Sequence, residues 1–201
     1  MSKVQICNRA LSTYLGVGRI NSLDEETPAA EQCNLHYDDT VKSLLEMDEW
    51  IFAAGRKVLA EVTNDRPDEW AYKYSNPSNM LLIRWVNEPE TARMLMLQDK
   101  SPDSDREMIE GFIYSDVQYA ACEYTKLVSD PTIFPQYFAD AVSAALAGHM
   151  AMPLTESLSR ASNASKVAEQ RLENAMVMNE RQSPPAPSRY LPDWTTERGV
   201  I

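Results

Sequence analysis

The longest uninterrupted helical pattern in the chain, residues 137–180, constrains the fold more than any other feature. From position 154 onward, apolar or small residues recur in steps of three and four, at Leu154, Leu158, Ala161, Ser165, Ala168, Leu172, Ala175 and Asn179. This spacing places them on one face of a helix, while charged residues occupy the opposite face. The segment after Pro153 would be about 40 Å long, which is more than one small core needs. We therefore expect part of its surface to contact another chain.

A proline divides this helical region. Pro153 cannot donate a backbone hydrogen bond to residue 149, and its ring would clash with that carbonyl, at a cost of about 3 kcal/mol in a straight helix. The sequence therefore predicts two helices joined by a tight break, or one sharply kinked helix. Small residues before the break, including Ala144 and Gly148, favour the close approach of a partner helix.

Two further helices are predicted nearer the N-terminus. Residues 3–15 have helical spacing and end at Gly16, a residue suited to the left-handed conformation just past a helix. Thr27 is a candidate N-cap, and Pro28 suits the first helical position, where its missing N–H costs nothing. The core face of this second helix is predicted to contain Ala30, Cys33, Tyr37, Val41 and Leu44. We expect a break near 48–50, with Trp50 and Phe52 packing inward.

Residues 70–128 are predicted to form a small sheet between the helices. The aromatic alternation of 70–74 and the composition of 80–86 favour paired strands, and 112–114 and 120–128 favour two more. The charged, proline-containing stretch 87–108 is expected to be an exposed excursion. The predicted fold class is thus mainly α: a bundle of about four helices with a small antiparallel β excursion, forming a single domain over residues 1–182.

The composition changes after residue 182. Four of the twelve prolines fall within 183–192, which predicts an extended, polyproline-like C-terminal arm over 183–201. The arm also contains Tyr190, Leu191 and Trp194, an apolar group that a solvated tail would rarely leave exposed together. We therefore expect the arm to dock on a partner.

The bulk composition excludes several classes of protein. A net charge of −11 argues against binding a nucleic-acid backbone, which requires clustered lysine and arginine. The three cysteines are far apart and lack CxxC spacing, so they offer neither a disulfide framework nor a zinc site. Polar residues interrupt the first ten positions, which predicts no secretion signal. The longest uncharged run, 141–155, is too short for a bilayer and is broken by His149 and Pro153, so no membrane span is predicted.

The residues of common catalytic and cofactor sites do not converge in this sequence. His36 and His149 lack the spacing of a metal-binding pair, and no glycine-rich phosphate-binding motif occurs. Cys122 has no basic neighbours that would activate it as a nucleophile. An acidic stretch resembles a loose cation site but lacks the glycine of a calcium loop, and it consists of Asp99, Asp103, Asp105, Glu107 and Glu110. We predict no catalytic residue, no metal and no cofactor.

The order of these elements resembles the phage head-to-tail adaptor (connector) family, known in short-tailed phages as tail tubular protein A or gatekeeper. The resemblance begins in ALSTYLGVGRINSLDEETPAAEQC, where a short helix and a glycine turn lead to a long helix, followed by Trp50, Phe52 and Ala53. It continues through the aromatic segment 70–86 and through SDPTIFPQYF, which precedes the next helix. A final long helix and a tail with Trp194 and Arg198 complete it.

The resemblance implies a structural protein of the virion that is not an enzyme. Members of the family form a twelvefold ring under the portal, at the head-tail junction, which joins the portal to the tail nozzle and leaves a channel for DNA. The implied partners are other copies of the chain, the portal and the nozzle protein, while genomic DNA passes without specific binding. Synthesis would occur in the host cytoplasm.

Within such a ring, individual residues are expected to have distinct roles. Helices within 28–47 and 134–180 would supply the bundle and the lateral subunit contacts, the latter through Leu158, Ala161, Ala168 and Leu172. The arm would bind the portal or a neighbouring copy through Tyr190, Leu191, Trp194 and Arg198. The sheet and residues 87–108 would face the tail or the lumen.

Two other classes of function remain open from the residues. A generic helical protein-protein interaction module would form no ring with a portal. A hydrolase or nuclease accessory would show metal-dependent activity that is lost when Asp103 and Asp105 are changed.

Overall fold

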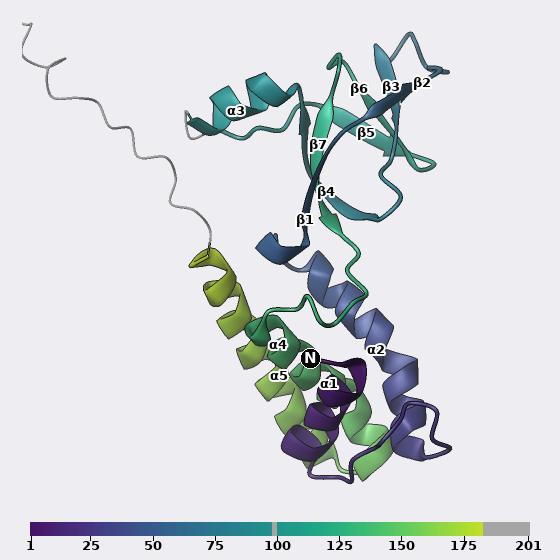
Figure 1. Ribbon diagram of the computed structural model, residues 1–201, viewed down its shortest axis with the longest axis vertical. Helices are drawn as coiled ribbons and strands as arrows, with labels where there is room; N and C mark the ends of the chain where they lie inside the picture. The colour runs from purple at the N-terminus through teal and green to yellow at the C-terminus, as the bar shows by residue number, and fades with distance from the viewer. Residues whose placement is uncertain (98–99, 183–201) are drawn as a thin grey trace, which may run out of the picture.

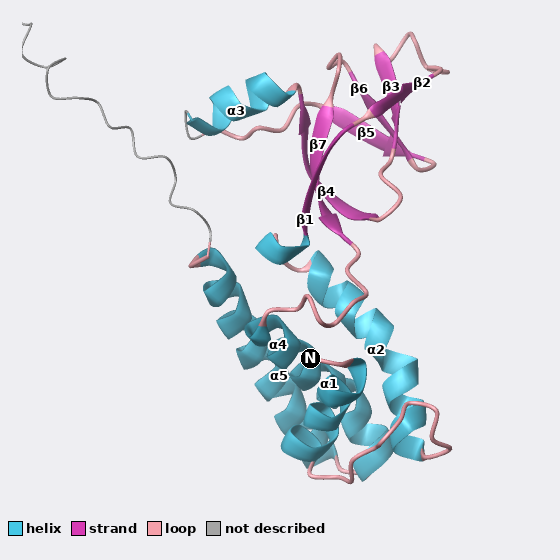
Figure 2. Ribbon diagram, in the orientation of Figure 1, coloured by secondary structure: helices cyan, strands magenta, loops and turns pink. Residues whose placement is uncertain are grey.

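The computed structural model describes residues 1–97 and 100–182. The long helices gather at one end of the molecule and two antiparallel sheets lie at the other (Figure 1; Figure 2). Among the described residues there are five α-helices and seven strands, with 48% helix and 19% strand. The fold is therefore α+β, and the prediction of a mainly α fold with about four helices is wrong.

Four α-helices build the helical end. α1 (Lys3–Arg9) continues directly into a π-helical turn, η1 (Ala10–Leu15), and is followed by α2 (Pro28–Glu46). α4 (Gln136–Thr155) is central, because α1, α2 and α5 (Leu158–Glu180) all pack against it. The largest side chains fully buried in this core include Trp50, Tyr37, Phe138 and Leu146.

Local sequence chemistry accounts for where these helices begin and end. Thr27 Oγ1 accepts a hydrogen bond from the backbone N–H of Ala30, and Pro28 lies at the first helical position, as predicted. Gly16 follows η1 in the left-handed conformation, with φ of 68°. All five residues predicted for the core face of α2 are buried.

The predicted break between the last two helices is confirmed. Pro153 lies in the final turn of α4, where the helix is about to end, and the chain then reverses at Glu156, which has φ of 50°. Ser157 begins α5 as its N-cap by accepting a hydrogen bond from the backbone N–H of Arg160.

The β region contains two sheets instead of one. The first has three strands in the order β1 (Ala54–Val58), β7 (Ala121–Lys126) and β4 (Met80–Asn87). The second has four strands in the order β2 (Ala60–Val62), β3 (Tyr72–Ser75), β6 (Phe112–Ser115) and β5 (Arg106–Ile109). Tyr74, Val86, Ile113 and Cys122 lie in their shared apolar core.

The predicted strand pairing and the limits of the β excursion are wrong. Residues 70–74 and 80–86 contribute strands, but β3 pairs with β2 and β6, whereas β4 pairs with β7. The sheets also begin at Ala54, well before residue 70. The stretch 87–108 contains a short helix, α3 (Pro89–Leu97), which projects beside the sheets, and most of β5 (Figure 1). Local preferences identify single strands, but pairing depends on partners distant in sequence.

The segment between α2 and β1 joins the helical end to the β region. As predicted, α2 ends before residue 48 and Trp50 is buried, and the Trp50 indole N–H donates to the Leu44 carbonyl at 2.7 Å. Phe52 in η2 (Ile51–Ala53) packs against Phe134 and Phe138.

Candidate assembly surfaces

Helix α5 has one face in the core of its own chain and one face in solvent. Ala164, Ala175 and Asn179 are buried, and the half-buried Ala161, Leu172 and Met176 pack against the same core. The other side of the helix, which includes Lys166, Gln170 and Glu173, is exposed. A single 23-residue helix therefore closes the bundle and presents a long uncovered face.

The four residues predicted for lateral contacts have different environments. Leu158, at the start of α5, is 77% exposed and open to a neighbour. Ala161 and Leu172 pack against the core of their own chain, and Ala168 is half-buried. The structure thus brings three of the four to the inward side of the helix, where they support the bundle itself.

The predicted arm contacts Tyr190, Leu191, Trp194 and Arg198 lie outside the described residues. The last described residue, Gln182, lies just beyond α5, and its Oε1 accepts a hydrogen bond from the Tyr137 hydroxyl at 3.3 Å. A shallow hollow lies beside this point and is lined by Arg9, Gln136, Tyr137, Asp140 and Met178.

Asp140 in α4 lines this hollow and contacts side chains from three other helical elements. Its carboxylate accepts a hydrogen bond from the Tyr14 hydroxyl at 3.0 Å and pairs with Arg9 at 3.2 Å and Arg171 at 3.5 Å. Burial, followed by the hydrogen bond to Asp140, raises the pKa of Tyr14. This cluster could not be predicted from the sequence because its members come from α1, η1, α4 and α5 and share no local motif.

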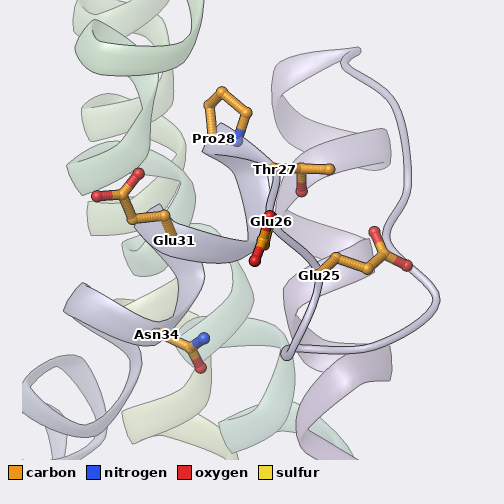
Figure 3. Close-up of a pocket in the computed structure, with 6 residues that line it drawn as sticks. All are labelled: Glu25, Glu26, Thr27, Pro28, Glu31 and Asn34. Carbon is orange, nitrogen blue, oxygen red and sulfur yellow. The ribbon is translucent and has the colours of Figure 1, made fainter.

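A second hollow lies at the beginning of α2 and is acidic. Figure 3 shows its lining residues, in which the Glu25 and Glu31 side chains point away from each other. Glu25 accepts hydrogen bonds from the backbone N–H groups of Asn21 and Ser22, and these bonds lower the pKa of Glu25. The carboxylate therefore fixes the loop that precedes the helix and does not converge with its acidic neighbours on a shared point.

The candidate catalytic residues His36, His149, Cys122 and Asp103 take part in packing, hydrogen bonds or ion pairs within the fold. His36 and His149 stack with ring centroids 5.7 Å apart. Burial raises the pKa of the Cys122 thiol to about 11, which disfavours the nucleophilic thiolate. Asp103 accepts from the backbone N–H of Val86 and pairs with Arg106. Within residues 1–97 and 100–182, no group of three or more His, Cys, Asp or Glu side chains is arranged to hold a metal ion.

Helix α3 presents an apolar surface within the stretch that was expected to be an exposed excursion, but its helical structure was not predicted. Ala92 packs against Trp85 and Ala121, and this contact anchors the helix to the three-stranded sheet. Met94, Met96 and Leu97 remain exposed. The signal that could have identified this helix is Pro89 followed by Glu90, a favourable pair in a first helical turn.

No helix in the described part of the chain combines the length and apolar character needed to cross a membrane. No protein-family model matches the chain, and a search of curated proteins finds no relative.

Proposed function

We propose that this chain is a structural head-to-tail adaptor of a tailed phage, which forms a ring under the portal and joins it to the tail nozzle. One observation carries the proposal: the subunit has a helical end and a β end, which differ in architecture and are separated along its longest axis (Figure 2). A connector subunit needs two such ends, because it binds one partner above and another below.

The helical end is suited to contact with neighbouring copies and the portal. The long α5 leaves its outer face uncovered, and the chain continues from its end into the proline-rich segment 183–201. In the proposed assembly, Tyr190, Leu191, Trp194 and Arg198 of that segment anchor the subunit on the portal. The β region and α3 are then directed to the nozzle, with the exposed Met94, Met96 and Leu97 as an adaptable contact surface.

The charge of the chain is consistent with a conduit for DNA. Thirty acidic residues exceed nineteen basic ones, so the ring would repel the phosphate backbone of passing DNA. Such a channel holds no specific nucleic-acid site and requires no catalytic group.

Electron microscopy of the purified chain, alone and mixed with its cognate portal, tests the proposal. We expect rings of uniform diameter seated on the portal in the mixture. A chain that stays monomeric or dimeric in both samples would instead support a generic helical interaction module.

Truncation tests the role of the C-terminal segment separately. A chain that ends at Gln182 should keep its helical content and its unfolding midpoint, but lose binding to the portal. Undiminished binding of this truncated chain would show that the portal contact lies elsewhere.

A further inference from the structure

Two of the three cysteines, which are far apart in the sequence, lie side by side in the helical core. Cys7 belongs to α1 and Cys33 to α2, and both are free thiols that are completely buried. The Cys7 thiol makes a hydrogen bond with the sulfur of Cys33. The Cys33 thiol also donates to Met150 Sδ of α4 at 3.7 Å. Cys33 is therefore in contact with sulfur atoms from two other helices.

A second contact, one helical turn away, shows how α1 lies against α2. Lys3 Nζ pairs with Asp38 at 3.1 Å and lies 4.5 Å from the centre of the Tyr37 ring. Cys7 follows Lys3 by four residues and Cys33 precedes Tyr37 by four, so the second pair lies on the same two helix faces as the first. Moving between the contacts goes forward along α1 and backward along α2, which is the relation of antiparallel helices. The packing of the two helices thus places the cysteines opposite each other.

The two thiols differ in acidity. Their hydrogen bond, followed by burial, raises the pKa of Cys7, whereas the same hydrogen bond, assisted by the charge of Lys3, lowers the pKa of Cys33. The thiolate is the form that reacts with oxidants, so Cys33 is the nucleophile and Cys7 is the thiol that attacks its oxidised product. Cys122 lies in the separate core of the two sheets, where burial raises its pKa.

We propose that Cys7 and Cys33 form a dithiol that hydrogen peroxide converts into a disulfide between α1 and α2. The Cys33 thiolate attacks one peroxide oxygen and the O–O bond breaks, which leaves a sulfenic acid on Cys33. The departing hydroxide takes up the proton that the Cys33 thiol had lost and becomes water. The Cys7 sulfur then attacks the Cys33 sulfur, and the displaced hydroxyl group leaves with the Cys7 proton as a second water. Two thiols and one peroxide thus give one disulfide and two waters.

Helix α1 suits this chemistry because it is short and lies at the surface of the bundle. It has seven residues, and the side chain of Lys3, one turn from Cys7, is 30% exposed. Such segments open locally at a lower free energy than the centre of a bundle, which admits a small oxidant. The disulfide would fasten α1 to α2. In the proposed virion, a use that rests on the adaptor function, the thiols stay reduced in the host cytoplasm and the disulfide forms after release.

Peptide mapping of the native wild-type chain tests the proposal. The chain is treated with hydrogen peroxide, remaining thiols are blocked, and trypsin is added without a reductant. We expect peptide 4–9 joined to peptide 20–42, with two hydrogen atoms lost, while Cys122 in peptide 107–126 keeps its thiol. The oxidised chain should unfold about 5–10 °C above the reduced chain, and dithiothreitol should reverse this rise. Free thiols at Cys7 and Cys33, or a link from either to Cys122 or to a second copy, would overturn the proposal.

Single substitutions test the separate roles of the two thiols. In Cys7→Ser, peroxide should leave Cys33 as a sulfenic acid that dimedone labels, because the second thiol is missing. Cys33→Ser should stay unlabelled at Cys7, and labelling there would contradict the choice of nucleophile. Cys122→Ser is the matched control and should form the disulfide like the wild type.

The wild-type peptide map decides the proposal even if a variant fails to fold, which circular dichroism would show. A missing disulfide contradicts the dithiol and leaves the adaptor function standing. A chain that forms the disulfide but assembles into no ring, with or without portal, contradicts the adaptor function and leaves the dithiol standing.

Discussion

Gly55 is required in the folded chain because a larger residue would not fit beside Tyr124. In the sequence it weakens a helical pattern, but in the structure it lies in β1 directly opposite Tyr124 of β7. A Cβ atom at position 55 would lie 2.8 Å from Tyr124 Cζ, closer than Cβ atoms approach other side chains in folded proteins. Gly55→Ala should therefore lower the free energy of unfolding by about 1–3 kcal/mol, as overpacking does.

A matched glycine in α4 provides the control for that substitution. An added Cβ at Gly148 meets no atom closer than 3.9 Å, so Gly148→Ala should be neutral or stabilise the helix by up to about 1 kcal/mol. Urea unfolding monitored by circular dichroism measures both changes. Equal stability of the two variants would show that β1 moves easily away from Tyr124.

The histidine pair makes the stability of the helical end depend on pH. His149 is exposed on one side, and partial desolvation where it packs, followed by the charge of the stacked His36, lowers the pKa of His149 from its usual value. The unfolded chain therefore takes up a proton on this side chain at a higher pH than the folded chain does. Stability should fall as pH decreases from 7 through about 6.5, the ordinary histidine pKa, and level off below the lowered pKa. His149→Gln should reduce this slope between pH 7 and 5, and an unchanged slope would contradict the assignment.

The chain between α4 and α5 turns at Glu156, whose backbone has an unfavourable conformation. Glu156 has φ of 50°, a left-handed conformation that costs about 1 kcal/mol or more for a residue with a side chain. Glu156→Gly should raise the free energy of unfolding by about 0.5–1 kcal/mol. The same substitution within α5, Glu173→Gly, should lower it by about 1 kcal/mol, because residue 173 is exposed in the helix interior. Thermal unfolding of both variants tests this reversal of sign.

At the scale of elements, the sequence predicts features that depend on local chemistry. Thr27, Pro28 and Gly16 mark helix ends because each acts through its own backbone or a hydrogen bond within one turn. Strand pairing differs, since β7 lies between β1 and β4 from distant parts of the chain. The β1 sequence AGRKV carries no alternation that would identify its partner.

At the scale of the whole molecule, the candidate surfaces were only partly predictable. Helical periodicity correctly placed Ala161 and Leu172 on a common apolar face, but it could not distinguish a face used within the subunit from one used between subunits. The exposure of a helix face depends on which other elements pack against it, and for α5 this follows only from the positions of η1 and α4.

Two polar side chains hold the segment between the helical end and the β region. Asn179 of α5, 4% exposed, accepts from the backbone N–H of Ile51 at 3.0 Å and donates to Asp48 and Glu49. On the other side, Arg84 of β4, whose side chain is 5% exposed, donates to the Trp50 carbonyl at 2.7 Å. The last turns of α5 and the first sheet are therefore linked through residues 48–51.

Removing one of these links should loosen the connection between the two ends of the subunit. Asn179→Ala leaves the partly buried Ile51 N–H without its acceptor and should lower the free energy of unfolding by about 1–3 kcal/mol. Hydrogen exchange should accelerate at residues 50–53 more than in the centre of α4, because the lost bonds restrain that segment. Asn174→Ala, at an exposed position of the same helix, is the control and should change neither quantity. If exchange at 50–53 stayed at the wild-type rate, Arg84 and the packing of Trp50 alone would suffice to hold the two ends together.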